Sequence, residues 1–334
     1  MESKHSIEKQ TAHHVDCFTT VSEITNNECR ELLDKPADVV LMNGFEDDFV
    51  PKGATFTGKR KRARSTMLRV ANCLLGEDLG DDTLIIGTSG RYEFKNKGID
   101  VFLESLNRLN RDKDLKKKVL AFVNVPSWVG DPREDLQKRL KSKDKFTEPL
   151  QCPFITHWLH NMTHDQVLDM LKYLGMGNRP EDKVKVIFVP CYQDGHDGIL
   201  NKHYYDLILG EDLSVYPSYY EPWGYTPLES VAFRVPTITT DLAGFGLWVN
   251  SLKNQHGIND GVEVLHRSDY NYSEVADGIK DTVALFSTKT EAEIKEIRKR
   301  AGQVAEQALW KHFIQYYYEA YDIALRNAMK RQLK

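Results

Sequence analysis

Two glutamates in the segment SYYEPWGYTPLESVAF are the side chains best suited to chemistry in this sequence. Glu221 and Glu229 stand eight residues apart, where the apolar run LSVYPS ends and a helix is predicted to begin near Pro227. Thr226 is a good N-cap, Pro227 suits the first helical position, and Glu229 completes a T-x-x-E capping box. On one continuous helix the two carboxylates would lie about 12 Å apart, beyond the roughly 5 to 5.5 Å of a retaining glycosidase pair. We therefore predict separate roles for them.

The same segment has the features of a phosphate site. Gly224, Tyr225 and Thr226 are able to present free backbone N–H groups at the positive end of the predicted helix, to a diphosphate at the carboxyl edge of a parallel sheet. The local pattern alone leaves this interpretation and the plain capping box equally open.

A second candidate group, GRYEFKNKG, follows the apolar run TLIIGTSG. Arg91 and Lys97 would lie at the mouth of a strand-to-helix turn. A guanidinium there grips phosphate oxygens with two N–H groups, and an ammonium neutralises the charge of a leaving diphosphate. Taken in isolation, the two are more simply explained as cations on a polar surface loop.

The elements that must position these side chains alternate along the chain. From residue 83, β-rich runs alternate with amphipathic segments in TLIIGTSG, IDVFLESLNRLN, KKVLAFVNV and VKVIFVP, and the pattern resumes in LSVYPS, VPTITTD and VEVLHR. A helix is predicted from Tyr272 to about Phe286, and the run from Glu291 onwards is predicted to be helical throughout. This alternation predicts an α/β fold with a doubly wound parallel sheet.

Composition narrows the class of ligand and the compartment. The net charge of −4 provides no general attraction for nucleic acid or for an anionic membrane. The five cysteines are odd in number and form no C-x-x-C pair, which argues against a disulfide framework and a zinc site. No apolar run approaches the roughly 20 residues of a membrane span, and MESKHSIEKQ lacks the apolar stretch of a signal peptide. We therefore expect a soluble, cytoplasmic protein that binds neither nucleic acid nor membrane. The sequence leaves open whether the protein forms a homo-oligomer.

Two further patterns are given simple structural interpretations. His157, His160 and His164 would share one helical face but lack a fourth ligand, so polar surface or packing is favoured over zinc. The basic run GKRKRAR, residues 58–64, is interpreted as a solvated connector because the overall charge is negative and no aromatic residues are interleaved. No D-x-D motif follows a predicted strand, so no metal is expected at a diphosphate.

Two long motifs resemble those of one enzyme family. YPSYYEPWGYTPLESVAFRVPTITTDLAGFG and SGRYEFKNKGIDVFLESLNRLN closely resemble the donor-site motifs of the eukaryotic-type glycogen synthases, which are retaining glucosyltransferases of the GT-B fold. FTTVSEIT, VKVIF and LWKHFIQYYYEAYDIALRNA resemble weaker landmarks of that family, so the resemblance runs from about residue 4 to residue 326. It implies transfer of glucose from UDP-glucose to the non-reducing end of glycogen or another α-1,4-glucan, with retained configuration and without cofactor or metal.

The resemblance also implies a role for each matching residue. Arg91 and Lys97 match the basic pair on the donor diphosphate, Glu221 matches the glutamate that faces the transferred glucose, and Glu229 matches the one that holds the ribose hydroxyls. Tyr204 falls where the family stacks a tyrosine on uracil, although a helix-packing aromatic suits that position equally well. The departing UDP oxygen would itself help to deprotonate the acceptor hydroxyl.

Four parts of the chain are predicted on this basis. They are the last unit of an N-terminal, acceptor-side Rossmann-like domain (1–45), a connector (46–80), a donor-binding domain (81–290) with an insertion near 126–183, and C-terminal helices (291–334) that pack back towards the N-terminal part.

Because only one unit of the acceptor-side domain is visible, we expect an N-terminally truncated chain. A module that binds UDP-glucose or UDP without turnover is therefore the alternative to a complete enzyme, and a phosphorylase relative that uses pyridoxal phosphate is a third hypothesis.

One departure from the family pattern concerns regulation. Arg298, Lys299 and Arg300 lie where the eukaryotic enzymes carry an arginine-rich helix that senses glucose 6-phosphate, but the later basic positions of that helix are absent here. The cluster is therefore interpreted as a solvated helical face.

Overall fold

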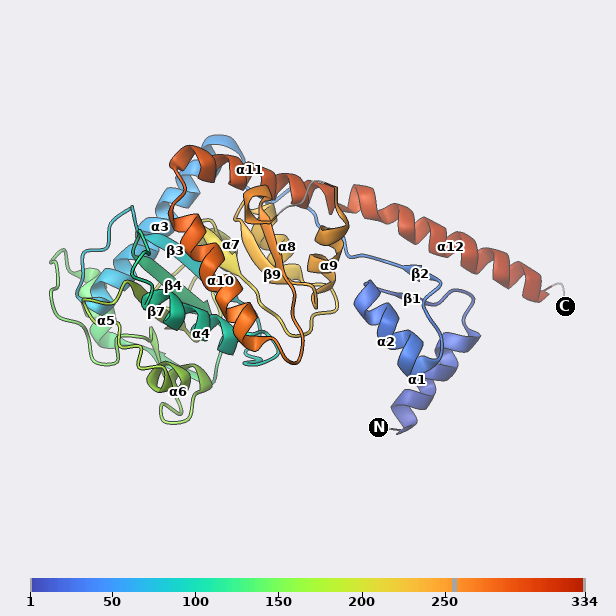
Figure 1. Cartoon of the computed structure of the whole chain (residues 1–334), viewed down its shortest axis with the longest axis horizontal. Helices are drawn as coiled ribbons and strands as arrows, with labels where there is room; N and C mark the ends of the chain where they lie inside the picture. Colours follow the sequence, from blue (N-terminus) through green and yellow to red (C-terminus); the bar gives the residue numbers. More distant parts are fainter. Residues whose placement is uncertain (1, 254–256, 333–334) are drawn as a thin grey trace.

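A six-stranded parallel sheet forms the centre of the computed structural model, which describes residues 2–253 and 257–332 (Figure 1). Its strands lie in the order β10-β9-β8-β3-β4-β7, and all neighbours are parallel. The strands are β3 (Leu84–Ser89), β4 (Val119–Asn124), β7 (Val184–Val189), β8 (Leu213–Val215), β9 (Thr237–Thr240) and β10 (Val262–Leu265). Each falls in an apolar run predicted as a strand, so the predicted doubly wound α/β fold is confirmed.

The middle strands form because their sequences are almost continuous apolar runs, which suit a parallel sheet that is covered on both faces. Every residue of β4 (VLAFVN) and of β7 (VKVIFV) is buried. The one cation in these two runs, Lys185, is fully buried, and its ammonium pairs with Oε1 of Glu77 at 2.5 Å. The sheet is thus a rigid base for the loops at its edges.

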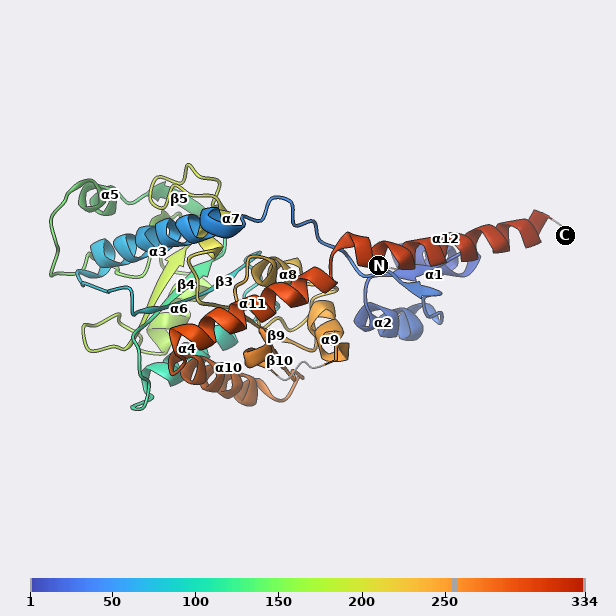
Figure 2. The same ribbon diagram turned by 90° about the horizontal axis from the view of Figure 1, so that it is seen from above.

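Helices cover both faces of this sheet, as Figures 1 and 2 show. They are α3 (Gly53–Leu75), α4 (Ile99–Asn110), α7 (Tyr204–Ile208), α8 (Tyr225–Ala232), α9 (Gly244–Ser251), α10 (Tyr272–Ser287) and α11 (Glu291–Gln307), with a 3-10 turn at Ile258–Asp260. Phe102 of α4 and Ile279 of α10 belong to the core on one face. Leu74 of α3 packs with Ile85 and Phe122 on the other face.

The segment predicted as an insertion builds a small subdomain beside β4 and β7. It contains an antiparallel pair, β5 (Val129–Pro132) with β6 (His157–Leu159), and the helices α5 (Glu134–Lys141) and α6 (Gln166–Tyr173). Asp165 caps α6 by accepting hydrogen bonds from two backbone N–H groups. Val167 and Leu171 of α6 join the main core, so the subdomain is fixed to the sheet.

The N-terminal elements and the C-terminal helix lie side by side, away from the large sheet (Figure 1). The N-terminal elements are α1 (Glu2–His14), β1 (Thr19–Thr20), α2 (Glu23–Leu33) and β2 (Val39–Val40), and β1 pairs in parallel with β2. The C-terminal helix α12 (Trp310–Gln332) reaches them, because Asn327 and Arg331 bond to Asp16, each at 2.8 Å. Across the described part of the chain, no helix has the length and apolar character needed to cross a membrane.

The C-terminal run forms two helices, but it is not helical throughout as predicted, because Ala308 and Leu309 lie outside both. Between α11 and α12, the N–H of Phe45 donates to the carbonyl of Ala308 at 3.0 Å, and the N–H of Trp310 donates to the carbonyl of Phe45 at 3.2 Å. Because a strand-like residue distant in sequence satisfies these backbone groups, the chain turns at Ala308 and Leu309 without a glycine or a proline.

The basic run GKRKRAR lies within α3, and the interpretation of this run as a solvated connector is wrong. Arg60 and Arg64 both pair with Asp212, with N···O distances of 2.5 and 2.7 Å. Lys59 pairs with Asp206 of α7 at 2.8 Å. These cations therefore attach α3 to the segment that precedes β8.

Candidate functional site

The two predicted groups of side chains meet at the point where the strand order reverses. The chain passes from β3 to β4 on one side, whereas β8 lies on the other side of β3. In doubly wound sheets, ligands bind in the crevice outside the carboxyl ends of the strands at such a point. Lys97 follows β3, Glu221 follows β8, and the Lys97 ammonium forms an ion pair with the Glu221 carboxylate.

The loops that carry this ion pair are joined through their backbones. The N–H of Tyr219 donates to the carbonyl of Asn96 at 2.7 Å. Gly98 has a φ of +67°, and a Cβ at this position would collide with the carbonyl oxygen of Pro217. The buried guanidinium of Arg267 donates to the same carbonyl oxygen. The relative position of Lys97 and Glu221 is thus set by the strands and not by flexible side chains alone.

Helix α8 begins earlier than the sequence predicts, and the predicted capping box is wrong. The N-cap is Gly224, with a φ of 109°, and Thr226 and Pro227 lie inside the first turn. No described side chain caps the helix, and Glu229 bonds elsewhere. The preceding loop is anchored instead by its backbone, since the N–H of Phe245 donates to the carbonyl of Trp223 at 2.6 Å. The N–H groups of Tyr225 and Thr226 thus lie in the first turn of α8, at the positive end of the helix dipole.

Glu229 lies on α8 and bonds to α7. Oε1 of Glu229 accepts a hydrogen bond from the phenol of Tyr205 at 2.8 Å. Burial raises the pKa of the Glu229 carboxyl, and the bond from Tyr205 opposes that rise. Glu221 and Glu229 therefore have different partners, Lys97 and Tyr205.

Tyr204 lies at the same edge of the sheet. Its phenol oxygen accepts a hydrogen bond from Ser89, the last residue of β3, at 3.0 Å. Burial, followed by the nearby Tyr216 and the charge of Glu229, raises the pKa of Tyr204. Tyr204 and Glu229 therefore lie near one another at the carboxyl end of β3.

Arg91 differs from the other predicted residues. Its side chain is 76% exposed and pairs with Glu93 at 3.0 Å. Within the described chain, no ion pair or hydrogen bond joins its guanidinium to Lys97, Glu221 or Glu229. It lies on the correct loop, but the structure does not bring it into contact with them.

A cavity of about 460 Å³ adjoins Glu221 and includes residues that the sequence analysis missed. Glu221 and Tyr225 line one side, while Thr20, Asn43 and Tyr317 come from β1, the segment after β2, and α12. Burial raises the pKa of Tyr225, and a hydrogen bond from Asn43 opposes the rise. Neither Asn43 nor Tyr317 stands in a pattern that reveals this position, because both are brought here by the return of α12 to the N-terminal segment.

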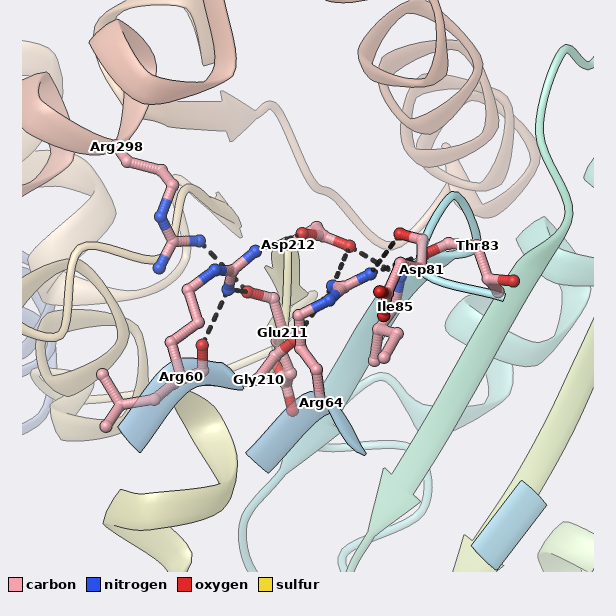
Figure 3. Close-up of polar contacts among 10 residues, drawn as sticks. Arg60, Arg64, Asp81, Thr83, Ile85, Gly210, Glu211, Asp212 and Arg298 are labelled. Atoms are coloured by element: carbon pink, nitrogen blue, oxygen red, sulfur yellow. Dashed lines mark hydrogen bonds and ion pairs between the residues drawn. The ribbon is translucent and has the colours of Figure 1, made fainter. Parts of the chain in front are cut away.

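A larger cavity, of about 1090 Å³, lies at the opposite, amino edge of β3 and β8, and Figure 3 shows the polar network in this region. Asp212, directly before β8, accepts bonds there from Arg60, Arg64 and the backbone N–H of Ile85. Arg298 of α11 is 8% exposed and donates to the carbonyl of Glu211 at 3.1 Å. The interpretation of Arg298 as part of a solvated face is therefore wrong. The network joins α3 and α11 to the amino edge of the sheet.

The three histidines of the H-x2-H-x3-H pattern do not share a helical face, and His157 packs inside the insertion, as the favoured interpretation expects. His157 is a buried residue of β6, whereas His160 and His164 lie outside helices. His157 does come within 4.8 Å of Cys191 and Asp197. Its Nε2 bonds to the carbonyl oxygen of Asp197 at 2.7 Å, and the Asp197 carboxylate accepts from backbone N–H groups of the following turn. These contacts give the group a structural role.

Comparison with known proteins gives a family match over nearly the whole chain. The family model described as "Glycogen synthase" matches residues 2–138 and 131–334. The glycogen [starch] synthase of Neurospora crassa is 28% identical over an alignment that covers 97% of this chain and 54% of that protein. Isoform 2 of the Saccharomyces cerevisiae enzyme is 29% identical, covering 99% of this chain and 56% of its own length. The chain thus spans about half the length of the curated relatives it matches.

Solved structures share the fold. A sucrose-phosphate synthase from Thermosynechococcus elongatus aligns with a TM-score of 0.54 and 17% identity, covering 100% of this chain and 62% of that one. The catalytic domain of starch synthase IV from Arabidopsis thaliana, bound to ADP and acarbose, aligns with a TM-score of 0.55 and 12% identity, covering 92% of this chain and 55% of that one. At these identities the likeness establishes the architecture and no more.

Proposed function

Because the chain belongs to the glycogen synthase family, we propose that it binds UDP-glucose between β3 and β8 and transfers glucose to the non-reducing end of an α-1,4-glucan with retained configuration. The observation that carries this proposal is the meeting of Lys97 and Glu221 at the switch point of the sheet, beside the start of α8. The Lys97 ammonium and the amino end of α8 both lie beside Glu221, and a cation and a helix N-terminus are the groups that recognise a nucleotide diphosphate.

The donor diphosphate would lie at the N-terminus of α8. Backbone N–H groups of Tyr225 and Thr226 and the positive end of the helix dipole favour its negative charge. Lys97 would contact the phosphates from the loop after β3, and Arg91 would turn to them from Glu93. This movement costs little, because an exposed ion pair is worth about 0 to 1 kcal/mol.

The nucleoside would be held by residues of α7 and α8. Glu229 would accept hydrogen bonds from the ribose hydroxyls, and Tyr204 would stack on uracil. The bond from Ser89 to the phenol oxygen of Tyr204 fixes the ring at the end of β3, which favours stacking over free rotation.

The proposed transfer exchanges one bond at the anomeric carbon for another on the same face of the sugar. The bond from this carbon to the UDP oxygen breaks, a bond to the acceptor hydroxyl oxygen forms, and the hydroxyl proton passes to the departing phosphate oxygen. Arg91 and Lys97 stabilise the charge that develops on UDP, and Glu221 stabilises the positive charge on the glucosyl group. The proposed chemistry needs neither cofactor nor metal, because these cations and the helix N-terminus supply the charge stabilisation.

The acceptor would enter through the cavity that Glu221 shares with Asn43 and Tyr317. A glucan is the proposed partner, and its non-reducing end must reach the glucosyl group from this side. The second candidate function is binding of UDP-glucose or UDP without turnover.

The test is to incubate the chain with UDP-glucose and a malto-oligosaccharide, and to follow UDP release and new α-1,4 linkages by NMR. Lys97→Ala should reduce transfer by about 10²- to 10³-fold, the loss typical of a missing charge-stabilising donor. Lys95→Ala removes the same charge from an exposed position on the same loop and should leave the rate unchanged. UDP binding without chain extension would favour the binding module, and failure to bind UDP would refute the donor site.

A further inference from the structure

Tyr205 lies beside the proposed ribose site, and no motif of the sequence gives it a role. Its phenol donates a hydrogen bond to Oε1 of Glu229 at 2.8 Å. Glu229 is partly buried on α8, and Tyr205 stands in the first turn of α7. Helices α7 and α8, which follow different loops, are thus connected at the carboxylate that is proposed to bind the ribose of the nucleotide.

The ring of Tyr205 is held in a fixed orientation by other aromatic rings. It stacks flat on Phe233, with a centroid distance of 5.2 Å and an interplanar angle of 3°. Phe49 packs against it from the segment before α3, with a centroid distance of 5.1 Å. Because both neighbours restrict the ring, the position of the hydroxyl is set by packing before any ligand arrives.

The bond from Tyr205 leaves the other carboxylate oxygen of Glu229 unused. A carboxylate accepts about four hydrogen bonds over its two oxygens. Among the hydrogen bonds of the described residues, Oε2 of Glu229 receives none, and Oε1 receives only the bond from Tyr205. Glu229 is therefore able to accept hydrogen bonds from the two hydroxyls of a ribose. Tyr205 determines which carboxylate oxygen of Glu229 remains available for them.

We propose that Tyr205 is a positioning residue that aligns Glu229 and thereby makes the site select ribonucleotides over nucleotides that lack the ribose hydroxyls. The inference rests on the proposed function, since it takes Glu229 as the ribose contact. A site built to accept hydrogen bonds from hydroxyl groups rejects ligands without them, because its buried acceptor is then left unpaired. A carboxylate free to rotate would lose much of this discrimination.

The test is a calorimetric titration of the chain with UDP and with 2′,3′-dideoxy-UDP. In Tyr205→Phe the rings stay stacked and only the hydroxyl is lost. We expect the Kd of UDP to rise about fivefold, the effect of one hydrogen bond, while the Kd of 2′,3′-dideoxy-UDP stays as in the wild type. The preference for UDP falls by the same factor. Tyr192→Phe, which removes a hydroxyl from an exposed tyrosine, should change neither value.

A double-mutant cycle separates positioning from a general effect on packing. In a Glu229→Gln background, Tyr205→Phe should produce a clearly smaller change in the Kd of UDP, because the residue that Tyr205 aligns has lost its charge. Equal weakening of both nucleotides by Tyr205→Phe, or the same loss in both backgrounds, would overturn the inference. A wild-type chain that binds both nucleotides equally refutes the ribose role of Glu229. A chain that binds neither refutes the donor site itself.

Discussion

Replacing Glu221 by Gln is expected to tighten the binding of UDP and to abolish glucose transfer. The Lys97 ammonium is paired with the Glu221 carboxylate in the structure. A diphosphate that takes up Lys97 competes with this pair and is repelled by the carboxylate. Gln is nearly isosteric with Glu and removes both effects, while the charge that would stabilise the glucosyl group is lost.

The size of the effect follows from how far the pair is withdrawn from solvent. The side chains of Lys97 and Glu221 are 15% and 19% exposed. An exposed ion pair contributes about 0 to 1 kcal/mol, whereas losing one partner of a buried pair costs about 3 to 5 kcal/mol. The energy of the Lys97–Glu221 pair is expected between these two limits. A contribution of about 1 to 1.5 kcal/mol corresponds to UDP binding about five- to tenfold more tightly in Glu221→Gln.

Isothermal titration with UDP measures this directly. Glu104→Gln is the matched control, because Glu104 has the same 19% exposure, pairs with Arg108 at 2.8 Å on α4, and loses the same charge. It should bind UDP as the wild type does. If Glu221→Gln binds UDP no more tightly than Glu104→Gln, the Lys97–Glu221 pair does not compete with the diphosphate, and the placement of the phosphates beside Lys97 is refuted.

Two predictions concern the amino edge of the sheet. Asp212→Asn should lower the free energy of unfolding, measured in urea melts, by about 3 to 5 kcal/mol, because Arg60 and Arg64 lose their buried counter-charge. A loss below about 1 kcal/mol would contradict a structural role for the network. Burial raises the pKa of Glu211 to about 8, so its protonated form stabilises the fold at low pH and this contribution is lost as the pH rises through about 8. The stability difference between wild type and Glu211→Gln should therefore fall between pH 5 and 8, and a difference independent of pH would show that Glu211 does not titrate in this way.

The strands were predictable because their signal is local. Runs such as VLAFVN are apolar and rich in β-branched and aromatic residues, so they are buried in any parallel sheet. Arg91, Lys97, Glu221 and Glu229 could be chosen as candidates for the same reason, since their motifs follow such runs. The contact between Lys97 and Glu221 could not be predicted, because it depends on β8 lying beside β3. Neither motif indicates the order of the strands in the sheet.

The wrong predictions have a common physical cause, which is that distant residues decide a local outcome. Helix α8 begins at Tyr225 because Gly224 takes a positive φ and the loop before it is bonded to the turn that begins α9. The last two helices separate where Phe45 supplies backbone partners, in a stretch with no helix-breaking residue. In the same way, the local sequence around Arg60 indicates a solvated cation, whereas the distant Asp212 pairs with its guanidinium.

The most direct test of the account is the affinity of UDP for the Arg91→Ala, Lys97→Ala double variant, measured by calorimetry beside the wild type. Each residue is proposed to make charge-assisted hydrogen bonds to the diphosphate, worth about 1.5 to 3 kcal/mol apiece, so the Kd should rise by about 100-fold or more. A double variant that binds UDP as tightly as the wild type would remove both cations from the site and contradict a diphosphate held between the β3 loop and α8.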